Sequence, residues 1–300
     1  MARLLEIDGY TIETEIGTGA MATVYLAEQT SLSRQVALKV MSPSLASNDT
    51  FAKRFIQEGK TIAKLEQNNI VNIFDIGTSE TCCYIAMEYL SGGTLKDRMQ
   101  RDMYLYEALQ IVRQIAQALS YAHQHHFIHR DIKPLNIMYR ADGTLVLTDF
   151  GIAKEIAAAT TGLTATGAAI GTPTYMSPEQ AKGEELDGRS DLYCLGVVLY
   201  ELLTGARPYM ASDPFALALQ HINAPIPGLP ERLHFLQDLI NKMLAKSPSK
   251  RFQDAEELIA AIDRTVKQHK TEVIQVLLND GITDDRTQVW YKTLLTDGQT

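Results

Sequence analysis

The stretch HRDIKPLNIM, residues 129–138, crowds polar and charged side chains between two apolar runs of the sequence. Five such side chains fall within eight positions: His129, Arg130, Asp131, Lys133 and Asn136. The Asp131 carboxylate can orient a hydroxyl nucleophile and accept its proton, and Lys133 can neutralise charge on a transferring phosphoryl group. Asn136 offers a carbonyl oxygen to a hard cation. The stretch therefore predicts a site that transfers a charged group to a hydroxyl.

A second carboxylate, Asp149, follows a short apolar strand in the segment LVLTDFGIA, residues 145–153. A lone carboxylate after a strand is most often a solvated turn. Here it follows Asp131, Lys133 and Asn136 in one ordered series between strand-like segments. We therefore interpret Asp149 as a second metal ligand.

Two features upstream suit a phosphate group. Gly17 and Gly19 lie between strand-like segments, where glycines let the backbone approach phosphate oxygens, although such a turn serves equally as a plain hairpin. The sequence contains no GxxxxGK[ST] loop. Lys39 lies in an apolar strand and requires an anionic partner, for which Glu58 on the following helix is available. Lys39 and Glu58 therefore predict either a structural ion pair or a phosphate-holding one.

The apolar spacing divides the chain into two parts. The first ninety residues contain one helical stripe, from Thr50, and five strand-like segments, at residues 10–17, 22–28, 35–41, 70–77 and 83–90. After Ser91-Gly92-Gly93 the spacing becomes helical, in residues 107–125, 190–205, 232–246 and 255–268. The pattern predicts an α+β fold, with a small five-stranded antiparallel lobe carrying one helix and a larger, mainly helical lobe.

The composition fits a globular, cytoplasmic protein. Of the 300 residues 45% are hydrophobic, and the net charge of −8 argues against binding of nucleic acid or of anionic membranes in general. Three cysteines without a CxxC pair predict neither a zinc site nor a disulfide framework. The first ten residues lack a signal-peptide core, and the longest apolar run, residues 195–200, is too short to span a bilayer. The sequence leaves open that the chain is the cytosolic part of a longer, membrane-anchored protein.

Together these segments resemble the eukaryotic-type (Hanks-type) Ser/Thr protein kinases, especially the bacterial members, over residues 8–265. The resemblance implies a bilobal protein kinase fold, with a small lobe over 8–90, a larger lobe over 91–265 and a C-terminal tail over 266–300. It implies transfer of the γ-phosphoryl group of MgATP to Ser or Thr hydroxyls of protein substrates in bacterial signalling. Mn²⁺ is the alternative to Mg²⁺.

The resemblance also assigns roles to single residues. Asp131 matches the catalytic base, and Lys133, supported by Thr172, matches the lysine typical of Ser/Thr kinases. Lys39 matches the lysine that contacts the α- and β-phosphates, and Glu58 matches its helix partner. The matching metal ligands are Asn136 and Asp149. The matching ATP-binding positions are Ile16, Gly17, Thr18, Gly19, Ala20, Val24, Ala37, Lys39, Met87, Glu88, Leu90 and Met138.

The segment GTPTYMSPEQ, residues 171–180, resembles the end of a kinase activation loop. In the family Glu179 would pair with Arg251 in a buried, architectural ion pair, and Asp191 would be a structural aspartate. Arg130, directly before the base, predicts control by phosphorylation, because a phosphothreonine would pair with it and order the loop. The predicted sites of autophosphorylation are Thr164 and Thr166, with Thr160, Thr161 and Thr174 as weaker candidates.

Three positions depart from the family pattern. Ala22 replaces the third glycine of the turn, a small change. Leu135 and Thr94 stand where kinases that select basic substrates place acids, so we expect no selection of arginine through these two positions. The alternative for Leu135 is simple packing against its loop.

Several alternatives stay open at this point. A pseudokinase scaffold is disfavoured because the residues of the catalytic set are all present, and a small-molecule phosphotransferase is disfavoured by the full 171–180 segment. The tail, with the only tryptophan at Trp290, either docks on the larger lobe or leads into a further domain. The resemblance also allows a homodimer through the small lobe.

Overall fold

The computed structural model describes residues 6–19, 22–42, 49–78, 82–150, 173–280 and 287–290. Five side chains of the first helix are outside this description, those of Asp49, Thr50, Phe51, Arg54 and Glu58. The described residues form two compact units, one within Met1–Gly93 and Met138–Ala169, the other within Thr94–Ile137 and Ile170–Thr300. In the described part of the chain, no helix is both long and apolar enough to cross a bilayer.

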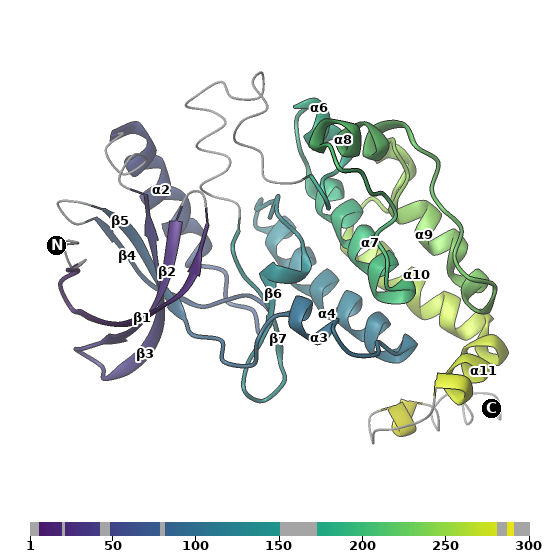
Figure 1. Cartoon of the computed structure of the whole chain (residues 1–300), viewed down its shortest axis with the longest axis horizontal. Coiled ribbons are helices and arrows are strands. Elements are labelled where there is room, and N and C mark those ends of the chain that lie inside the picture. Colours follow the sequence, from purple (N-terminus) through teal and green to yellow (C-terminus); the bar gives the residue numbers. More distant parts are fainter. Residues whose placement is uncertain are drawn as a thin grey trace. The chain divides into compact units, whose positions relative to one another are not determined.

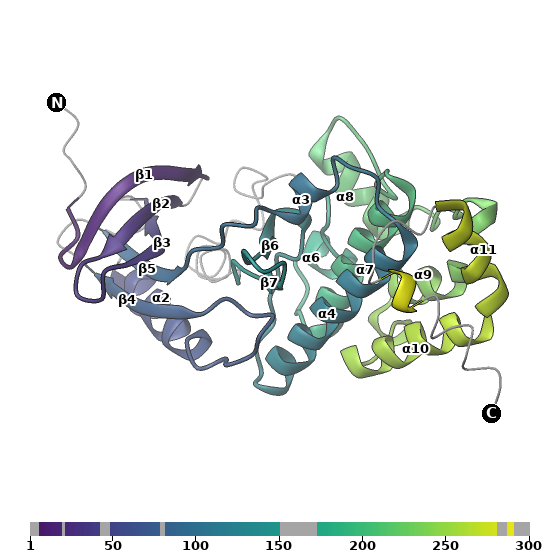
Figure 2. The same cartoon turned by 90° about the horizontal axis from the view of Figure 1, so that it is seen from below.

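The first unit is built on an antiparallel sheet of five strands (Figures 1 and 2). Its strands, in spatial order, are β1 (Tyr10–Thr18), β2 (Ala22–Gln29), β3 (Arg34–Met41), β5 (Cys83–Glu88) and β4 (Ile73–Thr78). Helix α2 (Asp49–Ile62) packs against β4. The predicted small lobe with one helix is therefore confirmed.

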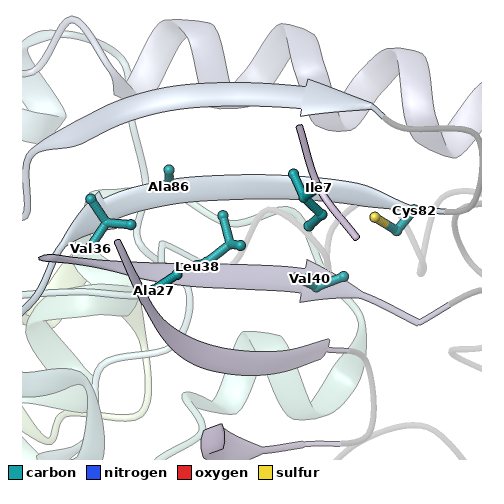
Figure 3. Packing of buried hydrophobic residues seen from close by; sticks show 7 residues of the cluster. All are labelled: Ile7, Ala27, Val36, Leu38, Val40, Cys82 and Ala86. Carbon is teal, nitrogen blue, oxygen red and sulfur yellow. The ribbon is translucent and has the colours of Figure 1, made fainter. Parts of the chain in front are cut away.

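Alternation along β3 gives the sheet two different faces. Val36, Leu38 and Val40 point to one face and pack in a buried cluster with Ile7, Ala27, Cys82 and Ala86 (Figure 3). The odd-numbered positions Ala37 and Lys39 belong to the opposite face. A single strand thus supplies core on one side and a candidate site residue on the other.

Residues 70–72 depart from the predicted strand. Ile70 forms a parallel bridge with Leu147 of β7 (Leu145–Leu147), and Val71 N donates to Leu147 O at 3.1 Å. Asn69 Nδ2 donates to Leu145 O at 2.7 Å, so β4 begins only at Ile73. These bonds join β7, and with it the start of the Asp149 segment, to the first unit. β6 (Ile137–Tyr139) pairs with β7 in a small second sheet.

The second unit is mainly helical, as predicted. Its longer helices are α4 (Leu105–Gln124), α7 (Gly188–Thr204), α8 (Pro214–Asn223), α10 (Ala255–Gln268) and α11 (Lys270–Asp280). Its shorter ones are α3 (Leu95–Arg98), η1 (Pro134–Asn136), α6 (Pro178–Lys182), η3 (Glu231–Leu236), α9 (Gln237–Met243) and η4 (Pro248–Lys250). α4 packs against both α7 and α10. α7 is buried from Ser190 to Leu203 and ends at Gly205, whose φ of 72° suits glycine.

One predicted helix is divided in the structure. The single helix predicted over 232–246 is a 3₁₀ segment followed by α9, because Leu233 N bonds to Pro230 O three residues back. Beyond α10, His269 leaves helical geometry and α11 begins at Lys270. At residues 287–290 the tail contacts the lobe, since the ring of Trp290 lies 4.8 Å from that of Tyr106 on α4.

Candidate active site

The loop over residues 129–136 is held by a buried aspartate of α7. Asp191 is fully buried, and its two carboxylate oxygens accept hydrogen bonds from the backbone N–H groups of His129 and Arg130, each at 2.8 Å. His123 Nε2 lies 2.9 Å from the same carboxylate. These bonds fix the backbone directly before Asp131.

The backbone is strained beside each candidate carboxylate. Arg130, directly before Asp131, has φ of 66°, and Asp149 itself has φ of 58°. Left-handed backbone is uncommon outside glycine, and such strain collects where a side chain must be aimed. Gln180 Nε2 donates to Arg130 O at 2.9 Å, which holds that conformation from the neighbouring α6.

Asp131, Lys133 and Asn136 are brought together in the second unit. Lys133 Nζ donates to Asp131 Oδ2 at 2.8 Å, and Asn136 Nδ2 donates to the same oxygen at 3.0 Å. Asn136 Nδ2 also lies 2.7 Å from Asp131 O. A carboxylate held by a lysine and an amide is kept in one orientation, which is what a base for a hydroxyl proton requires.

Lys39 and Asp149 are brought together in the first unit. Lys39 Nζ lies 2.7 Å from Asp149 Oδ1, and the two side chains are 21% and 35% exposed. Register places Lys39 between Val24 on β2 and Ile85 on β5, with Gly17 next in the row beyond Val24. The predicted partner, Glu58, has a side chain outside the described residues, so the Lys39–Glu58 pair stays a prediction.

The glycine turn between β1 and β2 is open on the side where side chains would stand. A Cβ atom added to Gly17 would meet no atom within 4 Å, and one added to Gly19 would meet only Ala22 O, at 3.7 Å. Packing among the described residues therefore does not require glycine here. The absence of side chains at these two positions is compatible with close approach of a ligand to the backbone.

The predicted adenine-binding positions belong to the first unit. Ala37 and Met87 are register partners on β3 and β5, both nearly buried, while Ile16 is 44% exposed on β1. Met87 also lines a cavity of about 30 Å³ with Lys39 and Phe150. That volume is roughly the space of a single water molecule.

The chain after β5 is hydrogen-bonded to β6. Gly92 N donates to Tyr139 O, and Tyr139 N donates to Gly93 O, both at 2.9 Å. A Cβ on Gly92 would lie 2.6 Å from Arg140 O, so the approach is too close for another residue. Burial raises the pKa of Glu88, but its hydrogen bonds to Arg140 outweigh burial and hold that pKa below its usual value. The Glu88 side chain therefore has a structural role. Met138 directly precedes Tyr139 and so lies next to this connection.

Glu179 and Arg251 form a buried bidentate ion pair, at 2.6 and 2.7 Å. Arg251 makes three further hydrogen bonds, to backbone oxygens of Ala245, Arg189 and Lys246. Ser190 Oγ donates to Glu179 Oε1 at 2.6 Å. The five donors of the guanidinium are all used, so this pair holds α6 and α7 to the 245–251 segment and has no capacity for a ligand.

Several predicted residues lie outside the described residues. These are Ala20 of the glycine turn, Thr172, the side chain of Glu58, and the candidate phosphorylation sites Thr160, Thr161, Thr164 and Thr166. The remaining candidate, Thr174, is nearly buried.

The sequence did not single out a charged groove beside Asp131. Glu201 of α7 is 5% exposed and accepts a hydrogen bond from Tyr175 at 2.6 Å, while Lys96 lies 3.5 Å from its other oxygen. Arg207 Nη1 is 3.5 Å from Thr174 Oγ1. The signal was present: a glutamate in a helix with no polar face needs a buried partner.

Two residues, Asn136 and Asp149, are predicted to bind a metal ion. Within the described residues no group of three or more His, Cys, Asp and Glu side chains gathers to hold an ion. Mg²⁺ is usually bound by one or two carboxylates together with substrate phosphates, not by an all-protein cage. The Asp149 carboxylate and the Asn136 amide oxygen are each donors that suit such an ion, and their binding of one metal stays a prediction.

The fold and the sequence motifs together match the protein kinase class. The family model "Protein kinase domain" matches residues 10–261. "Serine/threonine-protein kinase PknB" of Mycobacterium leprae is 42% identical over 282 residues, which cover 90% of this chain and 45% of that protein. "Serine/threonine-protein kinase PrkC" of Bacillus subtilis is 40% identical over 259 residues, 84% of this chain and 40% of that protein. The chain spans about half the length of the curated relatives it matches.

A solved structure supports the same assignment. The PknI kinase domain of Mycobacterium tuberculosis superposes with a TM-score of 0.70 at 29% identity, covering 89% of this chain and 99% of that one. The chain belongs to the protein kinase family, among the bacterial Hanks-type Ser/Thr kinases. This confirms the predicted family and the α+β protein kinase fold.

Proposed function

We propose that this domain transfers the γ-phosphoryl group of MgATP to Ser and Thr hydroxyls of protein substrates. The observation that carries the proposal is the Asp131 carboxylate, held by Lys133 and Asn136 on a loop whose backbone is fixed by Asp191. Membership of the bacterial Ser/Thr kinases supports it.

In this proposal Asp131 accepts the proton of the attacking hydroxyl, and Lys133 offsets charge on the phosphoryl group as it moves. Lys39 contacts the α- and β-phosphates, and the backbone around Gly17 and Gly19 covers them. Mg²⁺, or Mn²⁺ in its place, would neutralise charge on the phosphates when bound by Asn136 and Asp149. The adenine would lie against the apolar positions of the first unit and the backbone of 88–90.

Two residues, Leu135 and Thr94, bear on whether the domain selects arginine in its substrates. Leu135 is 57% exposed, which does not fit the alternative that it merely packs against its loop. Thr94 caps α3, since its Oγ1 accepts from Asp97 N at 3.1 Å. Neither residue offers a carboxylate, so we propose that neither selects arginine in a substrate.

The test is incubation of purified protein with ATP and Mg²⁺, followed by intact-mass measurement and peptide mapping, beside the Asp131→Asn variant. We expect added phosphate on Thr164 or Thr166 in the wild type and none in the variant. We also expect lower activity when both threonines are replaced by alanine. ATP binding without any phosphate transfer would favour the alternative, a pseudokinase-like scaffold.

We place the domain in the cytosol, where ATP and Mg²⁺ are supplied. The domain limits, 8–265 with a tail to 300, and homodimerisation through the small lobe belong to the same proposal. Light scattering at increasing protein concentration would test the dimer.

A further inference from the structure

A groove of about 530 Å³ adjoins the Asp131 loop within the second unit. Its walls come from α3, from the loop at Lys133–Leu135, from Thr174 and Tyr175, and from the chain after α7. This volume is many times the roughly 30 Å³ of one water molecule, so the groove has room for substrate side chains. Because Lys133 lines it and also contacts Asp131, the groove opens beside the proposed base.

Among the described residues that line the groove, the only acid, Glu201, is already engaged. Tyr175 Oη donates to one oxygen of Glu201 at 2.6 Å, and Lys96 lies 3.5 Å from the other. Burial, followed by this hydrogen bond, raises the pKa of Tyr175, so the phenol stays a donor. Glu201 is therefore not placed to receive an arginine from a substrate.

The positive charges of the groove are not all compensated. Lys133 pairs with Asp131 and Lys96 with Glu201, which leaves the guanidinium of Arg207. Within the part of the chain that the structure describes, Arg207 pairs with no carboxylate and has only the neutral Thr174 hydroxyl, at 3.5 Å. A guanidinium in this situation can form charge-assisted, bidentate bonds with an incoming carboxylate.

We propose that Arg207 is a specificity-determining residue that selects peptides with Asp or Glu near the acceptor Ser or Thr. The inference rests on the proposed kinase function. Leu135 and Met210, 57% and 62% exposed, line the same groove and suit an apolar residue beside the acid. The net charge of −8 repels acidic peptides at long range, so a local cation is needed to orient them.

The experiment measures kcat and KM for sets of threonine peptides that differ only by Glu, Gln or Arg at one flanking position. We expect kcat/KM about tenfold higher for the best-placed Glu than for Gln, the size of one contact of about 1.4 kcal/mol. In Arg207→Met the ratio of kcat/KM for the Glu peptide to that for the Gln peptide should fall to about one, mainly because KM for the Glu peptide rises. Arg207→Lys keeps the charge and should retain most of it.

The control is Arg264→Met, which removes the same charge from an exposed position on α10 and should leave the preference unchanged. Autophosphorylation is recorded for every variant as a check of the catalytic machinery. Equal use of Glu and Arg peptides by an active wild type overturns the inference, as does Arg207→Lys behaving like Arg207→Met. Absence of both peptide phosphorylation and autophosphorylation overturns the kinase function itself.

Discussion

Two ion pairs, one in each unit, join a basic side chain to a carboxylate, and they differ in how much water reaches them. Lys39 and Asp149 are 21% and 35% exposed and meet at 2.7 Å. Arg251 and Glu179 are 0% and 4% exposed and meet through two bonds. The first pair lies beside the glycine turn, while the second lies among helices.

The difference shows which pair is available for chemistry. Arg251 uses all five donors on protein atoms, so any exchange of partner would leave a buried charge uncompensated. Lys39 has one ion-pair partner among the described side chains, and water already reaches both groups. A phosphate could therefore share or replace that contact at little cost. One pair maintains the fold, and the other is poised for a ligand.

The largest effect is expected from breaking the buried pair. Glu179→Gln leaves the Arg251 guanidinium buried without a counter-charge, so the free energy of unfolding should fall by about 3–5 kcal/mol. Chemical denaturation with a folding-sensitive spectroscopic signal measures it. Arg251→Met should cost a similar amount. A loss below about 1 kcal/mol in both variants would show that the pair is not architectural.

Breaking the exposed Lys39–Asp149 pair should lower activity strongly and stability only slightly. Lys39→Met removes a proposed phosphate contact, so we expect kcat/KM for protein phosphorylation to fall on the order of 10²-fold or more. The free energy of unfolding should change by less than about 1 kcal/mol, because both groups are hydrated. Parallel assays of phosphorylation and denaturation test this. Near-normal activity combined with strong destabilisation would make Lys39–Asp149 the structural pair.

Local sequence patterns predicted several helix bounds and part of the candidate site. The predicted helix over 255–268 has the bounds of α10, and the apolar helix ends at Gly205 as predicted, because amphipathic spacing and a C-terminal glycine are local signals. The clustering of Asp131, Lys133 and Asn136 also follows from their closeness in sequence.

Contacts between residues that lie far apart in the sequence were harder to predict. Asp149 lies 110 positions from Lys39, and Tyr175 lies 26 positions from Glu201. Residue type shows that a buried charge needs a partner, but several acids could serve, and only the fold selects one. The division of residues 232–246 into η3 and α9 likewise depends on a local 3₁₀ bond that amphipathic spacing does not distinguish.

The pH dependence of stability should sharpen the comparison at the buried pair. Burial raises the pKa of Glu179, but the bonds from Arg251 and Ser190 outweigh it and hold that pKa below its ordinary value of 4.5. Because the folded-state pKa is depressed, the stabilisation is complete above pH 4.5 and is lost as the pH falls through the folded-state value. The difference in the free energy of unfolding between wild type and Glu179→Gln should therefore shrink progressively as the pH is lowered below 4.5. Unfolding curves from pH 7 to 3 that give a constant difference would contradict a charged Glu179.

The smallest effect is expected at a third pair, on the surface. Arg113 Nη2 lies 3.3 Å from Asp263 Oδ2, with the two side chains 39% and 56% exposed. Water and salt screen such a pair, and ordering two long side chains offsets what attraction remains. Asp263→Asn should therefore change the free energy of unfolding by no more than about 0.5 kcal/mol and leave kinase activity unaltered. If this variant instead lost more than about 1 kcal/mol, the exposure of the side chains would not set the strength of the three pairs.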